Sequence, residues 1–242
     1  MARIDRVLQF LVCPQRDFIG RLDDGRLPSN RLHVGSFATT RLRGTGLAGA
    51  PDPYVDTVRT LVDPERPGSD RVRLILDEDW HPNRCDEFAV FGRHCVKGSD
   101  GARLVGALED LRWRPQTRVI RANSINVGSS PRTREIIEEA LGGARIEHTR
   151  VGVFGVWTHI KVEYLLLHLS TMAPVFPHIA VCGPLCASPN EDDHRTALKK
   201  FRALGFEVFD DIPSYLDWLG VAQDALALRA ARQGTRAWKA GA

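Results

Sequence analysis

Short apolar runs alternate with amphipathic segments along most of this chain. Residues 7–13 form an apolar run that one polar residue, Gln9, interrupts. Such a run is typical of a strand that is buried on both faces of a parallel sheet. Similar runs predict five further strands, at 72–76, 119–120, 151–156, 178–182 and 206–209.

Helical patterns lie between most of these runs. Residues 54–62 place valines on one helical face, and residues 158–172 do the same with leucines, with Thr158 as the expected N-cap. A proline near the first turn and two glycines after the last turn delimit a helix at 131–141. Further helices are expected at 190–204 and 214–219. Residues 20–52 are predicted to be an irregular excursion with at most a short helix, and 79–101 a loop.

This alternation predicts an α/β fold, a doubly wound, Rossmann-like and mostly parallel six-stranded sheet with helices on both faces. One domain is expected over 1–220, followed by an Ala- and Arg-rich tail over 221–242 that is predicted to be helical. Sheets of this type bind ligands outside the carboxyl ends of their strands. If the first and fourth strands are neighbours, Cys13 and Lys161 lie near each other in that cleft.

Composition narrows the class of protein. Of the 242 residues, 43% are hydrophobic and 26% charged, and the net charge is only +3. These values are ordinary for a soluble globular protein, and no dense basic block predicts a nucleic-acid partner. No apolar stretch approaches the ~20 residues that span a bilayer. The first residues do not form a secretory signal, and five scattered cysteines form no disulfide framework, so we expect a cytoplasmic protein without a membrane partner.

Four segments, in the same order along the chain, resemble the isochorismatase-like cysteine hydrolases, a family that includes the nicotinamidases. The first, residues 11–18, is similar to the family's Val-Asp-x-Gln-Asn-Asp-Phe. Gln15, Asp17 and Phe18 match this motif, and Cys13 stands where the family has its catalytic Asp. The resemblance implies the isochorismatase-like fold and, because members of the family usually oligomerise, a homo-oligomer.

The second and third segments carry the residues that bind metal in the nicotinamidases. Asp79 and His81 match two of those ligands, and Glu87 replaces a later histidine. The third segment, residues 94–102, begins with His94 and is the most specific match, to His-Cys-Val-x-Gly-Thr-x-Gly-Ala. Carboxylates and imidazoles together suit Zn, Mn or Fe. The resemblance thus implies a divalent metal site; the alternative is that Asp79 and His81 only cap loop backbone groups.

The fourth segment, residues 155–162, resembles the turn that carries the family's nucleophile, Gly-Ile/Val-x-Thr-x-x-Cys-Val. Lys161 falls at the position of the cysteine. The resemblance implies an oxyanion hole of backbone N–H groups near Trp157 and Lys161, with a cis peptide between Val156 and Trp157. The family's catalytic lysine follows the third strand, where the nearest basic residue is Arg121, one position out of register. The implied pocket residues are Trp157, Thr158, His159 and Arg121.

Lys161 allows two interpretations. A helix start and a partly dry cleft both disfavour the charged amine, which predicts a lowered pKa and a neutral amine that acts as a base or forms a Schiff base. Alternatively, the lysine caps an inactive pocket or pairs with Asp17. Cys13 is either a relocated nucleophile with Lys161 as its base or a buried strand cysteine that acts as a small hydrophobe.

Two functions follow from these residues. The first is an isochorismatase-family hydrolase homologue with an altered catalytic triad, which binds a small polar, carbonyl-bearing molecule with help from the metal. Asp17 is then the nearest carboxylate that replaces the missing catalytic Asp. The second is a non-catalytic pseudoenzyme, a binding or regulatory protein that retains the pocket. A neutral Lys161 with a lowered pKa favours the first function, and a charged Lys161 that is ion-paired to Asp17 favours the second.

Overall fold

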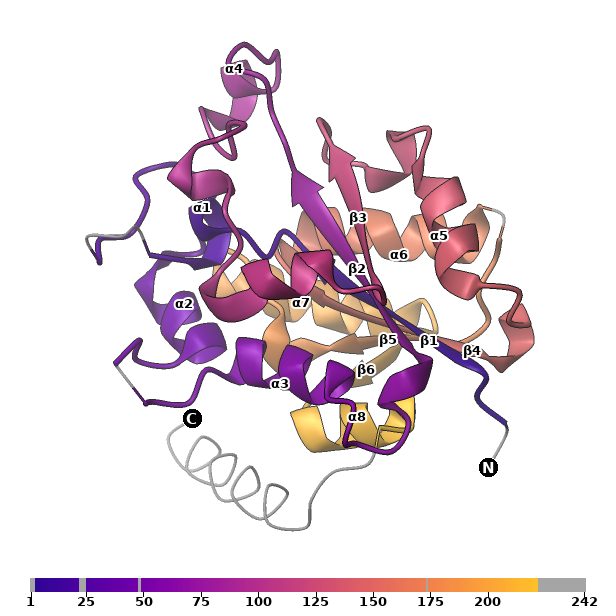
Figure 1. The fold of residues 1–242 in the computed structure, drawn as a ribbon. Helices are drawn as coiled ribbons and strands as arrows, with labels where there is room; N and C mark the ends of the chain where they lie inside the picture. Colours follow the sequence, from indigo (N-terminus) through magenta and orange to yellow (C-terminus); the bar gives the residue numbers. More distant parts are fainter. Residues whose placement is uncertain (1–2, 22–24, 48, 173, 222–242) are drawn as a thin grey trace.

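A six-stranded sheet forms the centre of the computed structural model, which describes residues 3–21, 25–47, 49–172 and 174–221 (Figure 1). All neighbouring strands are parallel, in the order β3-β2-β1-β4-β5-β6, which confirms the predicted fold class. The strands are β1 (Arg6–Val12), β2 (Val72–Asp79), β3 (Thr117–Ala122), β4 (Thr149–Gly155), β5 (Ile179–Cys182) and β6 (Glu207–Phe209). The tail predicted to be helical lies almost wholly outside the described residues.

Helices cover both faces of the sheet (Figure 1). The α-helices are α1 (Arg16–Ile19), α2 (Gly35–Arg43), α3 (Pro53–Val62), α4 (Phe88–Phe91), α5 (Thr133–Leu141), α6 (Glu163–Thr171), α7 (Glu191–Ala203) and α8 (Ile212–Leu219). The short turns of other helix types are η1 (Ser69–Arg71), η2 (Asp100–Ala102), η3 (Gly106–Trp113), η4 (Val127–Ser129), η5 (Ile146–His148), η6 (Thr158–Val162) and η7 (Gly183–Leu185). Helices α3 and α8 share one face, because Tyr54 and Tyr215 both pack against Phe154 of β4.

The polar side chain within the apolar run of β1 is hydrogen-bonded. Gln9 of β1 is fully buried and accepts a hydrogen bond of 2.6 Å from the hydroxyl of Tyr215 in α8. Gly152 of β4 lies beside this pair, and a Cβ at that position would overlap both side chains. The polar break in the first apolar run therefore anchors α8 to the sheet.

Three local predictions differ from the structure. Strand β2 continues past residue 76 to Asp79, because its terminal carboxylates find cations that are distant in sequence, among them Arg112. Residues 106–113 form η3, which the sequence pattern did not predict, whereas the excursion over 20–52 contains the short helix that was expected there, α2. Thr158 does not cap the helix that follows it. It begins the π-helical turn η6, and its hydroxyl bonds to His194 instead.

None of the helices within the described ranges is long and apolar enough to cross a membrane.

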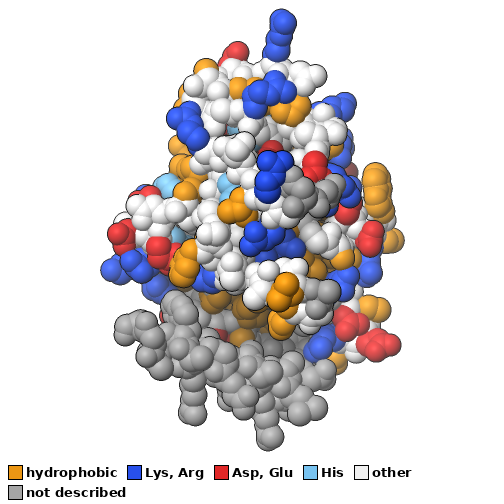
Figure 2. Space-filling model, turned by 90° about the vertical axis from the view of Figure 1, so that its left-hand side faces the viewer, with side chains coloured by type: hydrophobic (Ala, Val, Ile, Leu, Met, Phe, Trp, Pro, Cys, Tyr) orange, Lys and Arg blue, Asp and Glu red, His pale blue; other side chains and the backbone are white. Residues whose placement is uncertain are grey.

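On the face shown in Figure 2, the described basic side chains lie among acidic, polar and apolar ones and form several separate groups rather than one continuous patch.

Candidate functional site

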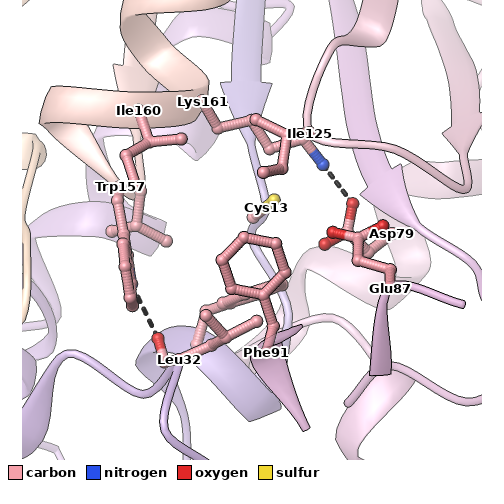
Figure 3. Close-up of a pocket in the computed structure, with 11 residues that line it drawn as sticks. Cys13, Leu32, Asp79, Glu87, Phe91, Ile125, Trp157, Ile160 and Lys161 are labelled. Atoms are coloured by element: carbon pink, nitrogen blue, oxygen red, sulfur yellow. Dashed lines mark hydrogen bonds and ion pairs between the residues drawn. The ribbon is translucent and has the colours of Figure 1, made fainter. Parts of the chain in front are cut away.

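A small pocket lies at the carboxyl ends of β1 and β4 (Figure 3). Its free volume is about 40 Å³. Since one water needs roughly 10–15 Å³ of such space, the pocket has room for about three waters. Most of its wall is apolar, and its ionisable side chains are two carboxylates, an amine and a thiol. The lining residues are Cys13, Phe18, Leu32, Asp79, Glu87, Phe91, Ile125, Val156, Trp157, Ile160 and Lys161.

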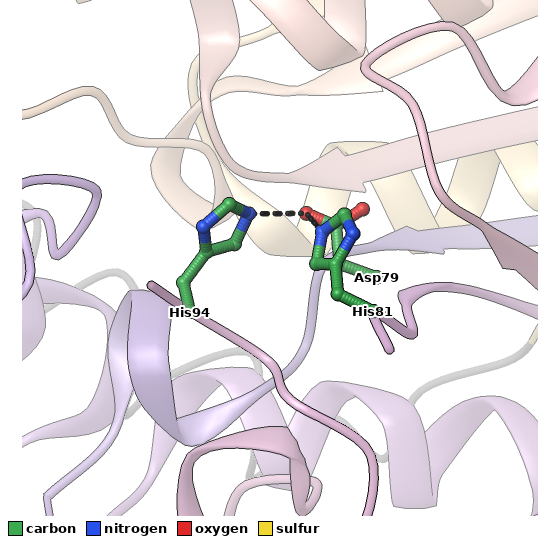
Figure 4. A group of neighbouring side chains, drawn as sticks. All are labelled: Asp79, His81 and His94. Carbon is green, nitrogen blue, oxygen red and sulfur yellow. Dashed lines mark ion pairs between the residues drawn. The ribbon is translucent and has the colours of Figure 1, made fainter. Parts of the chain in front are cut away.

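Asp79, at the end of β2, faces two histidines (Figure 4). Its Oδ2 lies 3.6 Å from Nε2 of His94 and 3.8 Å from Nε2 of His81. These distances exceed a hydrogen bond, and neither Nε2 atom has a hydrogen-bond partner in the described part of the chain. Ligands about 2.0–2.1 Å from a tetrahedral zinc are about 3.4 Å apart, so the three atoms are spaced as metal ligands are.

A hydrogen bond on the side of the ring away from Asp79 fixes the orientation of His94. Its Nδ1 donates a hydrogen bond of 2.8 Å to the carbonyl of Gly92, which leaves the lone pair of a neutral ring on Nε2. His81 packs against His94 with ring centroids 4.6 Å apart. Glu87, predicted as a fourth member of this set, groups instead with His81 and Cys85. The structure thus brings Asp79, His81 and His94 together, while Glu87 lines the same pocket as Asp79 and groups with His81 and Cys85.

Lys161 reaches into the site from η6 and forms an ion pair with Oδ1 of Asp79 (Figure 3). Its Nζ also lies 3.7 Å from Oδ1 of Asp77, a fully buried carboxylate that the sequence analysis missed. Burial alone would lower the pKa of Lys161, but Asp77 and Asp79 outweigh it and raise that pKa well above its usual range. The prediction of a lowered pKa and a neutral amine is therefore wrong.

Asp77 could have been found by strand alternation. Side chains two apart in a strand point to the same face, so a strand that includes Asp79 places Asp77 beside it. Burial raises the pKa of Asp77 to about 6 despite the attraction of Lys161. Both oxygens of Asp77 are without a hydrogen-bond partner among the described residues. The ammonium of Lys161, 3.7 Å away, is the cation that stabilises its negative charge.

Asp17 does not pair with Lys161, and it has a structural task instead. One of its oxygens accepts a hydrogen bond of 2.7 Å from the backbone N–H of Cys95, and the other accepts one from the amide of Asn30. Cys95 has a left-handed backbone with φ of 42°, so Asp17 secures a strained turn. Its carboxylate is engaged there and does not line the pocket.

Cys13 lies at the pocket wall next to Lys161, as the fold argument predicted. Its side chain is fully buried and its backbone is left-handed, with φ of 49°. Burial and the neighbouring Asp79 raise the pKa of its thiol well above the usual range, although Lys161 opposes the shift. The thiol is therefore protonated at neutral pH.

The remaining predicted pocket residues divide into two groups. The peptide between Val156 and Trp157 is cis, as expected, and Trp157 lines the pocket and donates a hydrogen bond of 2.7 Å to the carbonyl of Leu32. Thr158 and His159 lie behind this wall. The Thr158 hydroxyl pairs with Nδ1 of His194, and the His159 ring stacks on Trp157.

Arg121 lies outside the pocket. Glu78 and Arg121 are partners in the register of β2 and β3, and their side chains are 3.6 Å apart. The Arg121 guanidinium also stacks over Trp80. Because alternate residues of a strand face opposite sides, it is Ala122, the partner of Asp79, that faces the site. The structure thus places Arg121 apart from the pocket residues with which the resemblance grouped it.

Known structures with the same fold include nicotinamidases. No protein-family model matches this sequence, and no curated protein matches it at a significant level. A nicotinamidase/pyrazinamidase from Bacillus subtilis is 17% identical, with a TM-score of 0.64 over 85% of this chain and 100% of that chain. The pyrazinamidase of Pyrococcus horikoshii in complex with zinc is 18% identical, with a TM-score of 0.60 over 84% and 98%.

An isochorismatase-like hydrolase from Alkaliphilus metalliredigens is 17% identical, with a TM-score of 0.63 over 88% of this chain and 98% of that chain. Nearly the whole of each of these proteins superimposes on this one, while the identities are low. The chain therefore has the fold of the nicotinamidases and isochorismatase-like hydrolases.

Proposed function

We propose that this protein binds a small polar, carbonyl-bearing molecule beside a divalent metal, in the pocket between Trp157 and Asp79, and that thiol-dependent hydrolysis is not its activity. The observation that carries the proposal is the position of Asp79, which turns one oxygen to two imidazole nitrogens and the other to an ammonium. The oxygen that faces the imidazoles supports metal binding. The oxygen that faces Lys161 keeps this lysine charged, and a charged lysine is not a nucleophile.

The residues fit a metal ion. His81 Nε2 and His94 Nε2 are buried without a hydrogen-bond partner in the described structure, an arrangement that costs free energy unless a ligand satisfies it. One carboxylate and two imidazoles are donors that suit Zn, Mn or Fe, and three protein ligands leave a coordination position open. When bound there, such a metal would polarise a carbonyl or carboxylate oxygen of the ligand.

The rest of the pocket suits a small flat molecule. Trp157 and Phe91 provide aromatic surfaces, and Ile125 and Ile160 add aliphatic ones (Figure 3). Such walls exclude water and strengthen the few polar contacts that orient a ligand. The hydrogen bond from Trp157 to Leu32 holds the indole in place.

Hydrolysis through a thiol lacks its nucleophile. A protonated Lys161 has no lone pair and stands where the family has its cysteine. Cys13 is buried and protonated, and Asp17 is engaged with Cys95, so neither replaces the missing groups. Lys161 is charged, although its partner is Asp79 rather than Asp17, and a charged lysine at this position supports a binding or regulatory role.

A second function has one observation in its favour. Glu87 is a half-buried carboxyl at the pocket wall, and burial together with the nearby Asp79 raises its pKa. A carboxyl with a raised pKa is suited to general acid–base work near neutral pH, which a metal-assisted hydrolase requires. Turnover of a panel of amides and enol ethers that Glu87→Gln abolishes, with metal binding by Asp79, His81 and His94 intact, would establish this function. Turnover that survives Lys161→Ala would exclude a catalytic role for the lysine.

Elemental analysis of the purified protein tests the proposed metal site. We expect this site to contribute one equivalent of Zn, Mn or Fe, which is lost in the Asp79→Ala/His81→Ala variant. His148→Ala is the matched control, because His148 pairs with Asp5 at the opposite end of the strands and its loss leaves the site intact. Wild-type protein that takes up no metal, even after dialysis against Zn²⁺ or Mn²⁺, would refute the site.

A further inference from the structure

Three side chains after β2 form a second ligand group at the edge of the pocket. His81, Cys85 and Glu87 each offer one ligand atom, and these atoms lie within 4.8 Å of one another. His81 is fully buried, whereas Cys85 and Glu87 are half-buried. One ligand of the group is therefore held in the core, and the other two are accessible to an ion from solvent.

The distance between Cys85 and His81 fits a metal between them. Sγ of Cys85 lies 3.5 Å from Nδ1 of His81. Zinc–sulfur bonds of 2.3 Å and zinc–nitrogen bonds of 2.0–2.1 Å in a tetrahedral site set this separation at about 3.5 Å. A plain hydrogen bond between the two groups has a similar length, so the test below is designed to separate these two cases.

The His81 ring presents a different nitrogen to each ligand group. Nε2 faces Asp79 and His94, while Nδ1 faces Cys85. The two groups also differ in chemistry, because the first offers oxygen and nitrogen and the second adds sulfur, which thiophilic ions prefer. In addition, Lys161 already neutralises part of the charge on Asp79, whereas no lysine or arginine in the described ranges forms an ion pair with Glu87.

We propose that Nδ1 of His81, Cys85 and Glu87 form a metal site for zinc-class ions, separate from the Asp79–His81–His94 group. On binding, the Cys85 S–H bond is replaced by a sulfur–metal bond, and the proton leaves to solvent. Three protein ligands leave a fourth position for water or for a molecule in the pocket, since Glu87 lines that pocket. This site does not depend on the proposed function, although it shares His81 with the proposed Asp79 site and Glu87 with the second candidate function.

Cobalt titration of the metal-free, full-length protein tests the proposal. Co²⁺ replaces zinc in such sites, and a cobalt–thiolate bond gives a charge-transfer absorption in the near ultraviolet that oxygen and nitrogen ligands do not give. We expect this band to saturate at one equivalent. It should vanish in Cys85→Ser and persist in Asp79→Asn. Cys182→Ala, which removes a buried cysteine of β5, is the matched control and should keep the band.

Each other outcome decides the question. Co²⁺ that binds without the band would refute this site and leave the Asp79 site standing, since the Cys85–His81 contact is then only a hydrogen bond. No binding at all would refute both sites. A band that survives Cys85→Ser would assign the thiolate to another cysteine and overturn the proposal.

A second measurement covers the case in which Cys85→Ser does not fold. Alkylation of Cys85 in wild-type protein, followed by peptide mass spectrometry, should slow on the order of tenfold or more when Zn²⁺ is added, because a metal-bound thiolate is less available to an electrophile. An unchanged alkylation rate at saturating Zn²⁺ would overturn the proposal.

Discussion

The ammonium of Lys161 and the carboxylate of Asp79 form an ion pair between residues 82 positions apart in the chain. The lysine comes from the turn after β4 and the aspartate from the end of β2, two strands that flank β1. The pair means that Lys161 affects metal affinity, because a cation bound by Asp79 would also be close to this ammonium.

Replacement of Lys161 by methionine should tighten metal binding at the Asp79 site. The substitution keeps most of the side-chain volume and removes a positive charge that repels a dication through one shared carboxylate. We expect Mn²⁺ to bind on the order of 10- to 100-fold more tightly, measured by calorimetry. Lys161→Arg retains the charge and should change the affinity little, as should Lys199→Met on the exposed side of α7. Equal affinities in wild type and Lys161→Met would contradict the prediction.

The Lys161–Asp79 pair should be energetically coupled. Asp79→Asn leaves a buried ammonium with Asp77 as its only carboxylate, and loss of one partner of a buried pair costs about 3–5 kcal/mol. The double variant Asp79→Asn/Lys161→Met should recover much of this loss. Urea unfolding of the wild type and three variants gives the coupling free energy, which we expect to reach roughly 2 kcal/mol. Strictly additive effects would show that the contact contributes nothing.

Acid should destabilise the protein through His194. Burial lowers the pKa of this imidazole to about 3, and the neutral ring pairs with the Thr158 hydroxyl at the start of η6. Because the unfolded chain takes up this proton at a pKa near 6.5, the stability that depends on neutral His194 is complete above that pH. It is lost as pH falls toward 3, by up to about 1.4 kcal/mol per unit.

Unfolding free energies measured between pH 7 and 4 check this dependence. The slope in wild type contains every titrating group, so the informative quantity is its difference from His194→Gln, which cannot take up the proton. We expect a shallower slope in the variant. Identical slopes would mean that His194 is not the group responsible.

Gly152→Ala should destabilise the sheet through overpacking. The added methyl group would overlap the Tyr215 hydroxyl and the Gln9 side chain, which sit against β4. Such a clash in a well-packed core costs about 1–3 kcal/mol. Thermal unfolding of Gly152→Ala and of Gly152→Ala/Tyr215→Phe separates the cause, because removal of the hydroxyl should restore part of the loss. A double variant less stable than both single variants together would argue against this packing.

The fold was predictable because several of its strands coincide with local apolar runs in the sequence. β1 and β5 are buried along nearly their whole length, so their sequences consist mostly of hydrophobic residues. The end of β2 was missed because acidic residues are rare in strands. What permits them there is Lys161 and Arg112, which are supplied by distant parts of the chain.

The site was predictable in part, where its residues lie in recognisable motifs. The sequence placed Asp79, His81 and His94 together through their motif, and the structure brings them together. It misjudged Lys161, because the local helix start suggests a lowered pKa while two carboxylates from β2 determine the outcome. Asp17 matches the family's first motif, yet in the structure its carboxylate accepts a hydrogen bond from the backbone N–H of Cys95, 78 residues away.

The charged lysine at position 161 also determines how this protein responds to covalent reagents. Residues 155–162 resemble the turn that carries the family's nucleophile, so electrophilic probes for thiol hydrolases would be expected to react with a sulfur at position 161. Here they would meet an amine without a free lone pair, beside a buried and protonated thiol at Cys13. Such probes should therefore leave Lys161 and Cys13 unlabelled, and reversible ligands would be needed to reveal what binds between them.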